Sequence, residues 1–258
     1  MSSSEIVLGK AVVDAYNIAE REGWIKNFLD VFRKKHRVLV LGSSGAGKTQ
    51  LIRSLTSLVP ELVTVLQRTQ FVEKNKLEVN NELFEFIEAP GEIAKFEIRG
   101  SAIKDARDNA HGLILNVVAD GYHEYSEANI PELEGFDGRA SERYLDIHRE
   151  IEIELLSEWC HRLSQDEKKP RVVTVISKAD LWWSDRESIV SFYKNGEYSR
   201  VINGFGFDHA IVCYCSRIHK IHGIGLLDSH FDETTKEVLR GHLFQTIFSG
   251  LNISKGSF

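Results

Sequence analysis

The sequence has few cysteines and no long apolar run. Cys213 and Cys215 would share one face of a predicted strand, a spacing that favours packing over a metal site, and Cys160 lies far from both. No apolar stretch approaches the roughly 20 residues that a membrane-spanning helix needs. The start, MSSSEIVLGK, lacks the basic and apolar regions of a secretory signal, and neither end carries a lipidation motif. These absences predict a cytoplasmic protein in a reducing compartment, with no integral membrane segment.

Positive charge is not in excess either. The formal net charge is −6 at pH 7, so nucleic acid is not an expected partner. Hydrophobic residues make up 42% of the chain, a proportion typical of globular rather than disordered proteins. The 258 residues fit one α/β domain with additions.

The most informative stretch is 36–59, HRVLVLGSSGAGKTQLIRSLTSLV, in which an apolar strand leads through a glycine-rich turn into a helical pattern. From Gly42 to Thr49 it matches the phosphate-binding P-loop, G-x-x-x-x-G-K-[ST]; the alternative is a plain glycine-rich turn. In a P-loop, backbone N–H groups surround a phosphate, and the next helix adds its positive dipole end. Lys48 would then reach the β- and γ-phosphates, and Thr49 would ligate Mg²⁺. The residues expected to bind the nucleotide here are Ser44, Gly45, Ala46, Gly47, Lys48, Thr49 and Gln50.

Apolar strand-like runs alternate with helical patterns along the rest of the chain. This alternation is typical of a parallel sheet covered by helices on both faces. Asn80 and Asn81 are turn formers, and they favour a hairpin that adds one antiparallel strand. We therefore expect an α/β, three-layer P-loop NTPase fold with a mostly parallel sheet and one antiparallel edge strand. The expected strands are 38–41, 71–79, 82–87, 113–118, 171–176 and 210–215, and the expected helices include 51–59, 93–109, 185–195 and 234–248.

Another long helix is expected to begin at Ser141, which can cap it. Residues at helical spacing predict its buried face, namely Tyr144, His148, Ile151, Leu155 and Trp159.

The order of motifs resembles the GTPase branch of P-loop proteins, in particular small Ras-like and ADP-ribosylation-factor-like G domains. The resemblance covers roughly residues 36–248, apart from 119–140. It implies GTP or GDP as the ligand, Mg²⁺ as the cofactor, and effector, activating or exchange proteins as partners. The chain would then consist of an N-terminal helical extension, 1–35, and a G domain, 36–258, with a surface insertion at about 119–140. The extension either packs on the domain or docks a partner or membrane surface.

The base-binding side of the predicted site rests on Ser177-Lys178-Ala179-Asp180, which resembles the [NT]KxD motif of G domains. The resemblance implies that Asp180 accepts hydrogen bonds from guanine N1–H and the exocyclic amine, which adenine cannot offer in that place. The stem of Lys178 would cover the base plane. Ser177 replaces the usual Asn or Thr, so we expect weaker bracing of the loop but retained guanine preference. Ser216 and Arg217 resemble the last guanine-side loop, where a backbone N–H meets the base.

The metal and catalytic residues are expected after the strand that ends near Ile87. Glu88-Ala89-Pro90-Gly91 stands where G domains have DxxG, so the resemblance implies that Glu88 holds Mg²⁺ and that the Gly91 N–H meets the γ-phosphate. Glu88 is one methylene longer than the usual aspartate, which changes Mg²⁺ geometry. Glu92 replaces the usual glutamine, and it either acts as a base or opposes the γ-phosphate by its charge. Lys48, Gly91 and Glu92 form the predicted catalytic set.

Thr69 is the candidate third metal ligand. It lies 19 residues before Glu88 and 21 after Lys48, spacings similar to those of the ADP-ribosylation-factor group. Its hydroxyl would join Mg²⁺ only when a γ-phosphate is present. Thr64 is the competing candidate. Arg68 is either a solvated side chain or an arginine finger supplied in cis.

Together these motifs predict a GTP-binding protein that hydrolyses GTP slowly to GDP and phosphate and acts as a switch. A nucleotide-binding adaptor or sensor with little turnover is the alternative that Glu88 and Glu92 suggest. A P-loop ATPase or phosphotransferase is a third possibility, because the P-loop alone does not select the base.

Overall fold

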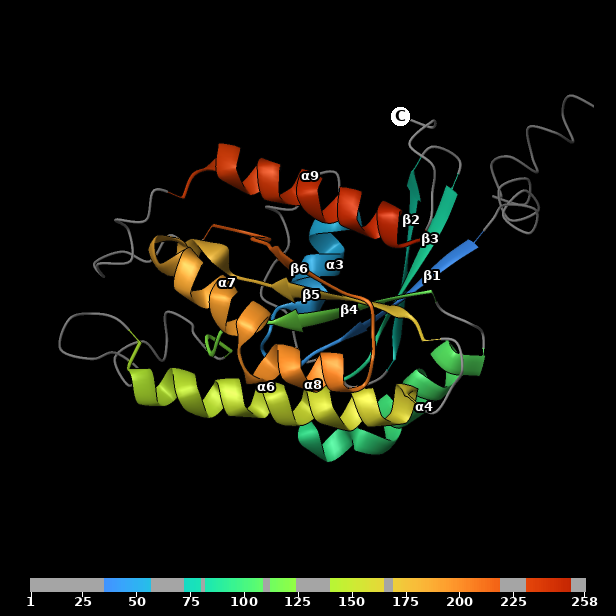
Figure 1. The fold of residues 1–258 in the computed structure, drawn as a ribbon. Coiled ribbons are helices and arrows are strands. Elements are labelled where there is room, and N and C mark those ends of the chain that lie inside the picture. Colours follow the sequence, from blue (N-terminus) through green and yellow to red (C-terminus); the bar gives the residue numbers. More distant parts are fainter. Residues whose placement is uncertain are drawn as a thin grey trace, which may run out of the picture.

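The computed structural model describes residues 35–56, 72–79, 82–108, 112–123, 140–164, 169–218 and 231–251 (Figure 1). Several predicted features lie outside these ranges: the helices before residue 35, Thr64, Arg68, Thr69, the Asn80–Asn81 turn and most of the 119–140 insertion.

The centre of the fold is a six-stranded sheet with the order β2-β3-β1-β4-β5-β6. Among the strands that the structure describes, only the β2–β3 pair is antiparallel; the other four pairs are parallel. This arrangement confirms the predicted fold class, including the single antiparallel edge strand. Its strands are β1 (Lys35–Leu41), β2 (Glu73–Val79), β3 (Glu82–Glu88), β4 (Leu113–Val118), β5 (Arg171–Ile176) and β6 (His209–Cys213).

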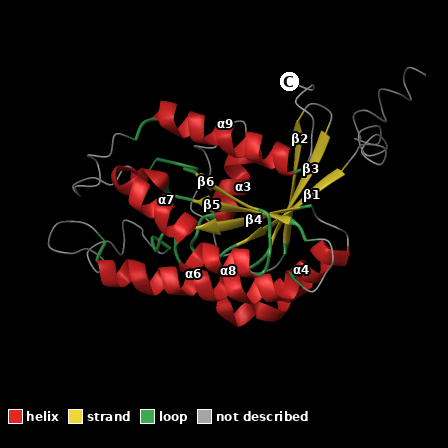
Figure 2. Ribbon diagram, in the orientation of Figure 1, coloured by secondary structure: helices red, strands yellow, loops and turns green. Residues whose placement is uncertain are grey.

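Helices cover both faces of the sheet (Figure 2). Helices α3 (Lys48–Thr56) and α9 (Glu233–Gly250) lie on one face, and α4 (Phe96–Asp108), α6 (Glu142–Leu163), α7 (Arg186–Asn195) and α8 (Glu197–Gly204) lie on the other. Alternate side chains of β1 pack on opposite faces of the sheet. Val38 and Val40 belong to the core under α3 and α9, and Leu39 and Leu41 belong to the core under α4 and α6. Because residues 38–41 of β1 are buried on both sides of the sheet, this part of the strand is a continuous apolar run.

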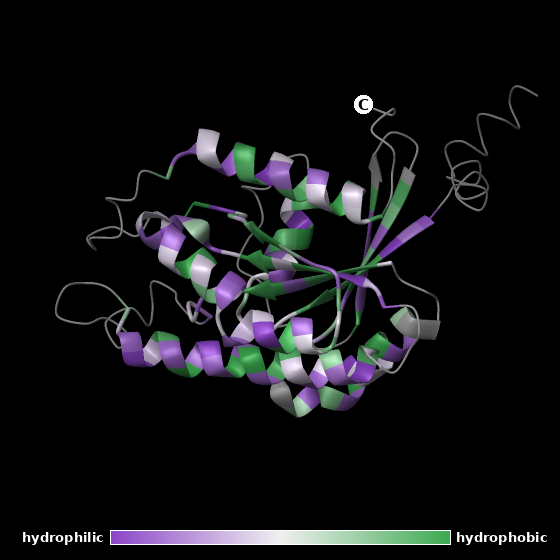
Figure 3. Cartoon of the chain, viewed as in Figure 1, coloured by the Kyte–Doolittle hydropathy of each residue, from purple (hydrophilic) through white to green (hydrophobic). Residues whose placement is uncertain are grey.

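The hydropathy pattern separates the sheet from its covering helices (Figure 3). Apolar colour is concentrated on the central strands, and every residue of β4 is buried. The helices alternate between polar and apolar residues, as expected for elements with one buried face. Among the described residues, no helix is both long and apolar enough to cross a bilayer.

Helix α6 begins as predicted but buries a different face. Ser141 is its N-cap, and the hydroxyl accepts a 3.3 Å hydrogen bond from the amide of Tyr144. The predicted face is wrong in part, because Tyr144, His148 and Ile151 are only half-buried. The buried residues are Leu145, Glu152, Leu155, Leu156, Trp159, Cys160 and Leu163. The buried face is thus rotated relative to the predicted one, and it includes a glutamate, which an apolar pattern does not count.

The second half of the chain shows two further differences from the sequence prediction. Strand β6 ends at Cys213 rather than at residue 215, and α8 follows α7 where no helix was expected. Helix α8 is only eight residues long, and its buried face rests mainly on Tyr198 and Ile202. Two apolar positions give too weak a periodic signal to predict a helix.

Candidate nucleotide-binding site

Five loops leave the carboxyl ends of the parallel strands at one edge of the sheet. Ligands of open α/β sheets bind outside this edge. Four of these loops carry predicted site residues, namely the P-loop after β1, the Glu88 turn after β3, the Ser177 turn after β5 and the Ser216 turn after β6. The fifth loop, 119–123 after β4, was predicted to belong to the surface insertion.

The P-loop has the backbone geometry that phosphate binding requires. Gly42, Gly45 and Gly47 all have positive φ angles, of 136°, 76° and 92°. A side chain on Gly42 would place its Cβ 2.1 Å from the carbonyl oxygen of Val117, so only glycine fits against β4. The helix begins at once, since the amide of Leu51 donates to the carbonyl of Gly47 at 2.8 Å. The P-loop therefore leads directly into the N-terminus of α3, whose positive dipole end favours a bound anion.

Lys48 is almost fully buried within its own loop. Its ammonium group donates to the carbonyls of Gly42 and Ser43, at 3.1 and 2.9 Å. Burial lowers the pKa of Lys48 to about 8; nearby Arg99 lowers it further, and nearby Glu88 opposes the shift. A phosphate ligand would favour the charged form, so binding should become linked to protonation near this pH.

We expect the dissociation constant for GDP to rise about tenfold between pH 7 and pH 9, because above pH 8 the free protein must take up a proton on Lys48 to bind. A fluorescence titration at each pH measures this change. Lys48→Arg stays charged over the whole range, so its weaker binding should vary little with pH. An equal slope in both proteins would contradict the assignment.

The two predicted metal ligands with described positions lie together. The hydroxyl of Thr49, on the first turn of α3, donates a 2.6 Å hydrogen bond to Oε1 of Glu88 at the end of β3. Glu88 is only 1% exposed, so its charge sits in a protected position beside the P-loop. Two oxygen donors, one of them anionic, suit Mg²⁺, which usually takes one or two protein oxygens besides phosphate and water.

Gly91 lies directly against the P-loop. Its carbonyl accepts a 3.1 Å hydrogen bond from the amide of Ser44. A Cβ on Gly91 would lie 2.5 Å from both the Lys48 ammonium nitrogen and the carbonyl carbon of Ser43. The carboxylate of the next residue, Glu92, instead lies 3.8 Å from the ammonium group of Lys95. The structure thus brings Gly91 to the phosphate loop and pairs the Glu92 side chain on its own segment.

The base-side loop is tied to the P-loop through Ser177. Its buried hydroxyl donates a 2.6 Å hydrogen bond to the carbonyl of Ala46. Although Ser177 replaces the usual Asn or Thr, its hydroxyl makes a short, buried bond between the two loops. Lys178 adopts a left-handed conformation, with φ of 56°, and its ammonium donates to the carbonyls of Tyr122 and His123.

Asp180 is positioned by the loop after β6. It is 5% exposed, and its Oδ1 accepts a 3.3 Å hydrogen bond from the thiol of Cys215. Burial, together with the neighbouring carboxylate of Asp180, raises the pKa of Cys215, so the thiol stays protonated and continues to donate. Ser216 and Arg217 follow at the same edge, the first half-buried and the second exposed.

The sequence did not reveal the role of residues 119–123. Ala119, Asp120, Tyr122 and His123 are each at most 7% exposed, so they are not part of a surface insertion. The Asp120–Gly121 pair signals a turn, but nothing local shows that the turn packs against the P-loop. Glu152 was missed for a similar reason, since a buried carboxylate on a helix shows only as a break in the apolar pattern.

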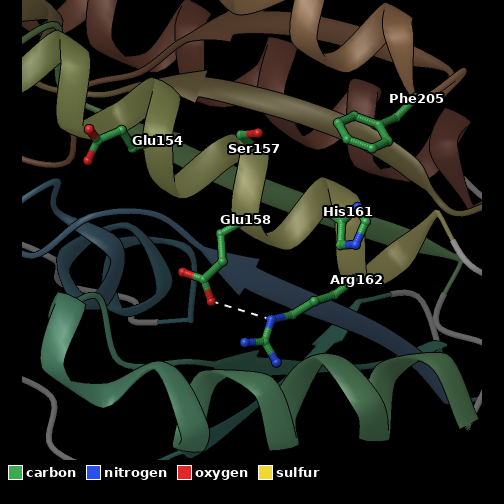
Figure 4. Close-up of a pocket in the computed structure, with 6 residues that line it drawn as sticks. All are labelled: Glu154, Ser157, Glu158, His161, Arg162 and Phe205. Carbon is green, nitrogen blue, oxygen red and sulfur yellow. Dashed lines mark ion pairs between the residues drawn. The ribbon is translucent and has the colours of Figure 1, made fainter.

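Figure 4 shows the residues that line a hollow elsewhere on the surface. It has a volume of about 610 Å³, and its lining residues are Glu154, Ser157, Glu158, His161, Arg162 and Phe205. These belong to the second half of α6 and the segment after α8, which lead to the amino ends of β5 and β6. Figure 4 shows the Glu158–Arg162 ion pair, whose closest atoms are 3.4 Å apart. The hollow therefore lies away from the loops that carry the predicted site.

A family model described as 50S ribosome-binding GTPase matches residues 37–178, more than half of the chain. The chain belongs to this GTPase family. The match runs from β1 to Lys178 and so includes the P-loop, Glu88 and Gly91. The protein is thus a GTP-binding G domain with a P-loop, and the family generally hydrolyses GTP.

Two solved structures resemble this G domain at low identity. Translation elongation factor SelB from Methanococcus maripaludis, in complex with the GTP analogue GppNHp, is 17% identical with a TM-score of 0.44; the alignment covers 86% of this chain and 35% of that one. A bacterial selenocysteine-specific elongation factor, EF-Sec, is 14% identical with a TM-score of 0.45, covering 84% and 29%. This chain spans about a third of the length of both structures. No curated protein sequence matches it.

Proposed function

We propose that this G domain is a Mg²⁺-dependent GTPase that hydrolyses GTP slowly and acts as a small Ras-like or ADP-ribosylation-factor-like switch. The observation that carries the proposal is the contact between Gly91 and the P-loop amide of Ser44. That amide belongs to the group of N–H donors that would bind phosphate. A γ-phosphate would compete for the amide, so the segment after Glu88 would sit differently with GTP than with GDP.

Each residue of the site has a role in this proposal. Lys48 and the P-loop amides would donate to the phosphate oxygens and stabilise the charge that develops there. Thr49 and Glu88 would hold Mg²⁺, which supplies additional positive charge at the phosphates when bound. Asp180 would select guanine by accepting from its two ring-edge donors.

The segment after Gly91 has an anchor that would transmit a change in its position. Arg99, which is 2% exposed, donates to the carbonyls of Pro90 and Glu92 at 3.4 and 3.0 Å. Its guanidinium also donates to the carboxylate of Glu158 on α6, at 2.6 Å. A movement of the Gly91 segment would therefore have to break or carry along bonds that reach another helix.

The remaining parts of the proposal extend beyond the described site. Residues 1–35 would form a helical extension to a G domain of 36–258, in a cytoplasmic protein that meets effector, activating or exchange proteins. Thr69 would complete the Mg²⁺ ligands. These proposals rest on motif spacing and on the family resemblance.

Single-turnover hydrolysis of bound GTP, measured at several Mg²⁺ concentrations, tests the proposed function. We expect slow turnover that requires Mg²⁺. Glu88→Gln keeps an acceptor for Thr49 but loses the charge, so the Mg²⁺ concentration for half-maximal rate should rise about tenfold. Glu85→Gln is the control on the same strand; Glu85 pairs with Lys35 at 2.7 Å, and its loss should leave the Mg²⁺ requirement unchanged.

A nucleotide-binding adaptor with little turnover is the second candidate, and the pairing of Glu92 with Lys95 favours it. In that pairing Glu92 does not serve as a base for an attacking water. Tight GTP binding without measurable hydrolysis at saturating Mg²⁺ would support the adaptor and rule out the GTPase acting on its own.

A further inference from the structure

Loop 119–123 is a buried turn wedged between the P-loop and α6. Asp120 and Gly121 have positive φ angles of 48° and 84°, and the amide of Tyr122 donates back to the carbonyl of Ala119 at 2.9 Å. A non-glycine residue with positive φ is uncommon and costs energy, so the surrounding structure must hold it in place. Asp120 is held by Arg149 of α6, which donates to its two carboxylate oxygens at 3.0 and 2.9 Å.

The side chain of His123 joins the P-loop to α6. Its Nε2 lies 2.5 Å from Oε1 of Glu152, and the hydroxyl of Ser43 lies 3.1 Å from Nε2 and 3.4 Å from Nδ1. With Nε2–H donating to Glu152, Nδ1 can accept from Ser43. All three side chains are buried, with residue exposures of 4% or less. Ser43 is the P-loop residue whose carbonyl receives the Lys48 ammonium at 2.9 Å. The imidazole therefore fixes the residue that holds the catalytic-site lysine.

Glu152 is the anchor of this network. Its Oε1 accepts from the amide of Ala119 at 2.7 Å, and its Oε2 accepts from the hydroxyl of Tyr193 at 2.5 Å. These bonds satisfy both oxygens of a buried carboxylate with donors from loop 119–123 and α7. A fully satisfied buried network is rigid, because each lost bond would leave a costly unpaired group.

The backbone of the same turn also contacts both halves of the site. The carbonyls of Tyr122 and His123 accept from the ammonium of Lys178, on the base side. On the phosphate side, the P-loop backbone at Gly45 comes so close that a Cβ there would lie 2.3 Å from the carbonyl oxygen of His123. One short turn thus contacts the phosphate loop and the base loop at once.

We propose that His123, held by Glu152, is a positioning residue that fixes the P-loop and the Lys178 loop in the arrangement that receives a guanine nucleotide. This inference rests on the proposed nucleotide binding but not on hydrolysis. Because the two loops are already ordered before the nucleotide binds, ordering them takes less from the binding free energy. Loss of the imidazole should therefore speed dissociation of GDP and GTP alike, since both use the P-loop and the base.

Dissociation rates of fluorescent GDP and GTP analogues test the proposal. We expect His123→Ala to release both nucleotides about tenfold or more faster, a loss of about 1.4 kcal/mol or more of binding free energy. His123→Gln should restore most of the retention, because its amide can donate to Glu152 and accept from Ser43. Tyr193→Phe keeps the ring but removes one donor to Glu152, so it should release nucleotide several-fold faster even if His123→Ala does not fold.

Tyr198→Phe is the matched control. Its hydroxyl belongs to another buried network, with Asn116 at 2.6 Å and Thr174 at 2.9 Å, both within the sheet. This variant should lose stability in a denaturant titration but keep the wild-type dissociation rate. If weakened packing in general were the cause, Tyr198→Phe would release nucleotide as fast as Tyr193→Phe. That result would overturn the positioning role.

A double-mutant cycle tests whether His123 acts through Ser43. Both substitutions break the same link between His123 and Ser43. The double variant, Ser43→Ala with His123→Ala, should therefore release nucleotide no faster than the faster of the two single variants. Additive effects, or a wild-type release rate in His123→Ala and Tyr193→Phe, would overturn the inference while leaving GTP binding intact. Failure of the wild-type protein to bind GDP would overturn the proposed function as well.

Discussion

Replacing Asp180 by asparagine is expected to weaken GDP and GTP binding by about 100-fold and to favour xanthine nucleotides instead. The carboxylate would accept from two guanine donors, whereas an amide presents a donor of its own to one of them and leaves that group unpaired. Xanthine carries an oxygen in place of the exocyclic amine, so it can accept from the new amide. Competition of GDP, XDP and ADP against a fluorescent guanine nucleotide measures the change.

The control for this variant is Asp185→Asn, which makes the same substitution at an exposed carboxylate five residues further along the chain. It should leave nucleotide preference unchanged. The assignment of Asp180 would be wrong if Asp180→Asn still preferred GDP to XDP, or if the wild-type protein bound ADP as well as GDP.

Replacing Gly91 by alanine is expected to lower the rate of GTP hydrolysis by about 100-fold. A Cβ at this position would lie 2.5 to 2.6 Å from backbone atoms of Ser43 and Ser44, which cannot move without disturbing the P-loop. The segment would have to withdraw from the P-loop, so the Gly91 N–H would no longer reach the γ-phosphate. Loss of one such donor typically costs 100- to 1,000-fold in rate. Single-turnover hydrolysis measures the loss.

GDP affinity separates this effect from general damage to the site. GDP has no γ-phosphate, so its dissociation constant should change by no more than about threefold in Gly91→Ala. Gly241→Ala is the matched control, since a Cβ there meets nothing within 4 Å and the helical position should gain about 0.5–1 kcal/mol of stability. Wild-type hydrolysis by Gly91→Ala would show that Gly91 does not serve the γ-phosphate.

The fold was predictable because its signals are short-range. The P-loop pattern lies within one strand, one turn and one helix, and buried parallel strands appear as continuous apolar runs. The order of the sheet then follows from the fold class. It places Glu88, at the end of β3, beside Thr49, which lies at the start of the helix that follows the neighbouring strand β1. That expected proximity is found, as a 2.6 Å hydrogen bond between the two side chains.

The buried polar network was not predictable, because its partners are far apart in sequence. Ser43 and His123 are separated by 80 residues, and His123 and Glu152 by 29. Periodicity treats a glutamate as a solvent-facing residue, so the predicted face of α6 was wrong in part and left Glu152 out of the core. Similarly, no local rule shows that loop 119–123 turns inward instead of outward, since its direction depends on Arg149 and Glu152 of α6.

The base-side loop shows a third limit of sequence reasoning. A motif comparison considers only which residue Ser177 replaces. The strength of the hydrogen bond that Ser177 makes depends instead on its distance and burial. The hydroxyl reaches the carbonyl of Ala46 at 2.6 Å, and the bond is buried. Such a fit between two loops is set by the sheet that carries both.

Isothermal titration calorimetry on nucleotide-free protein, with GDP, GTP and ADP in the presence of Mg²⁺, tests the central claim most directly. We predict one site per chain, a dissociation constant of about 1 μM or tighter for both guanine nucleotides, and binding of ADP at least about 100-fold weaker. No heat with GDP or GTP from a folded sample, or equal affinity for ADP, would contradict it.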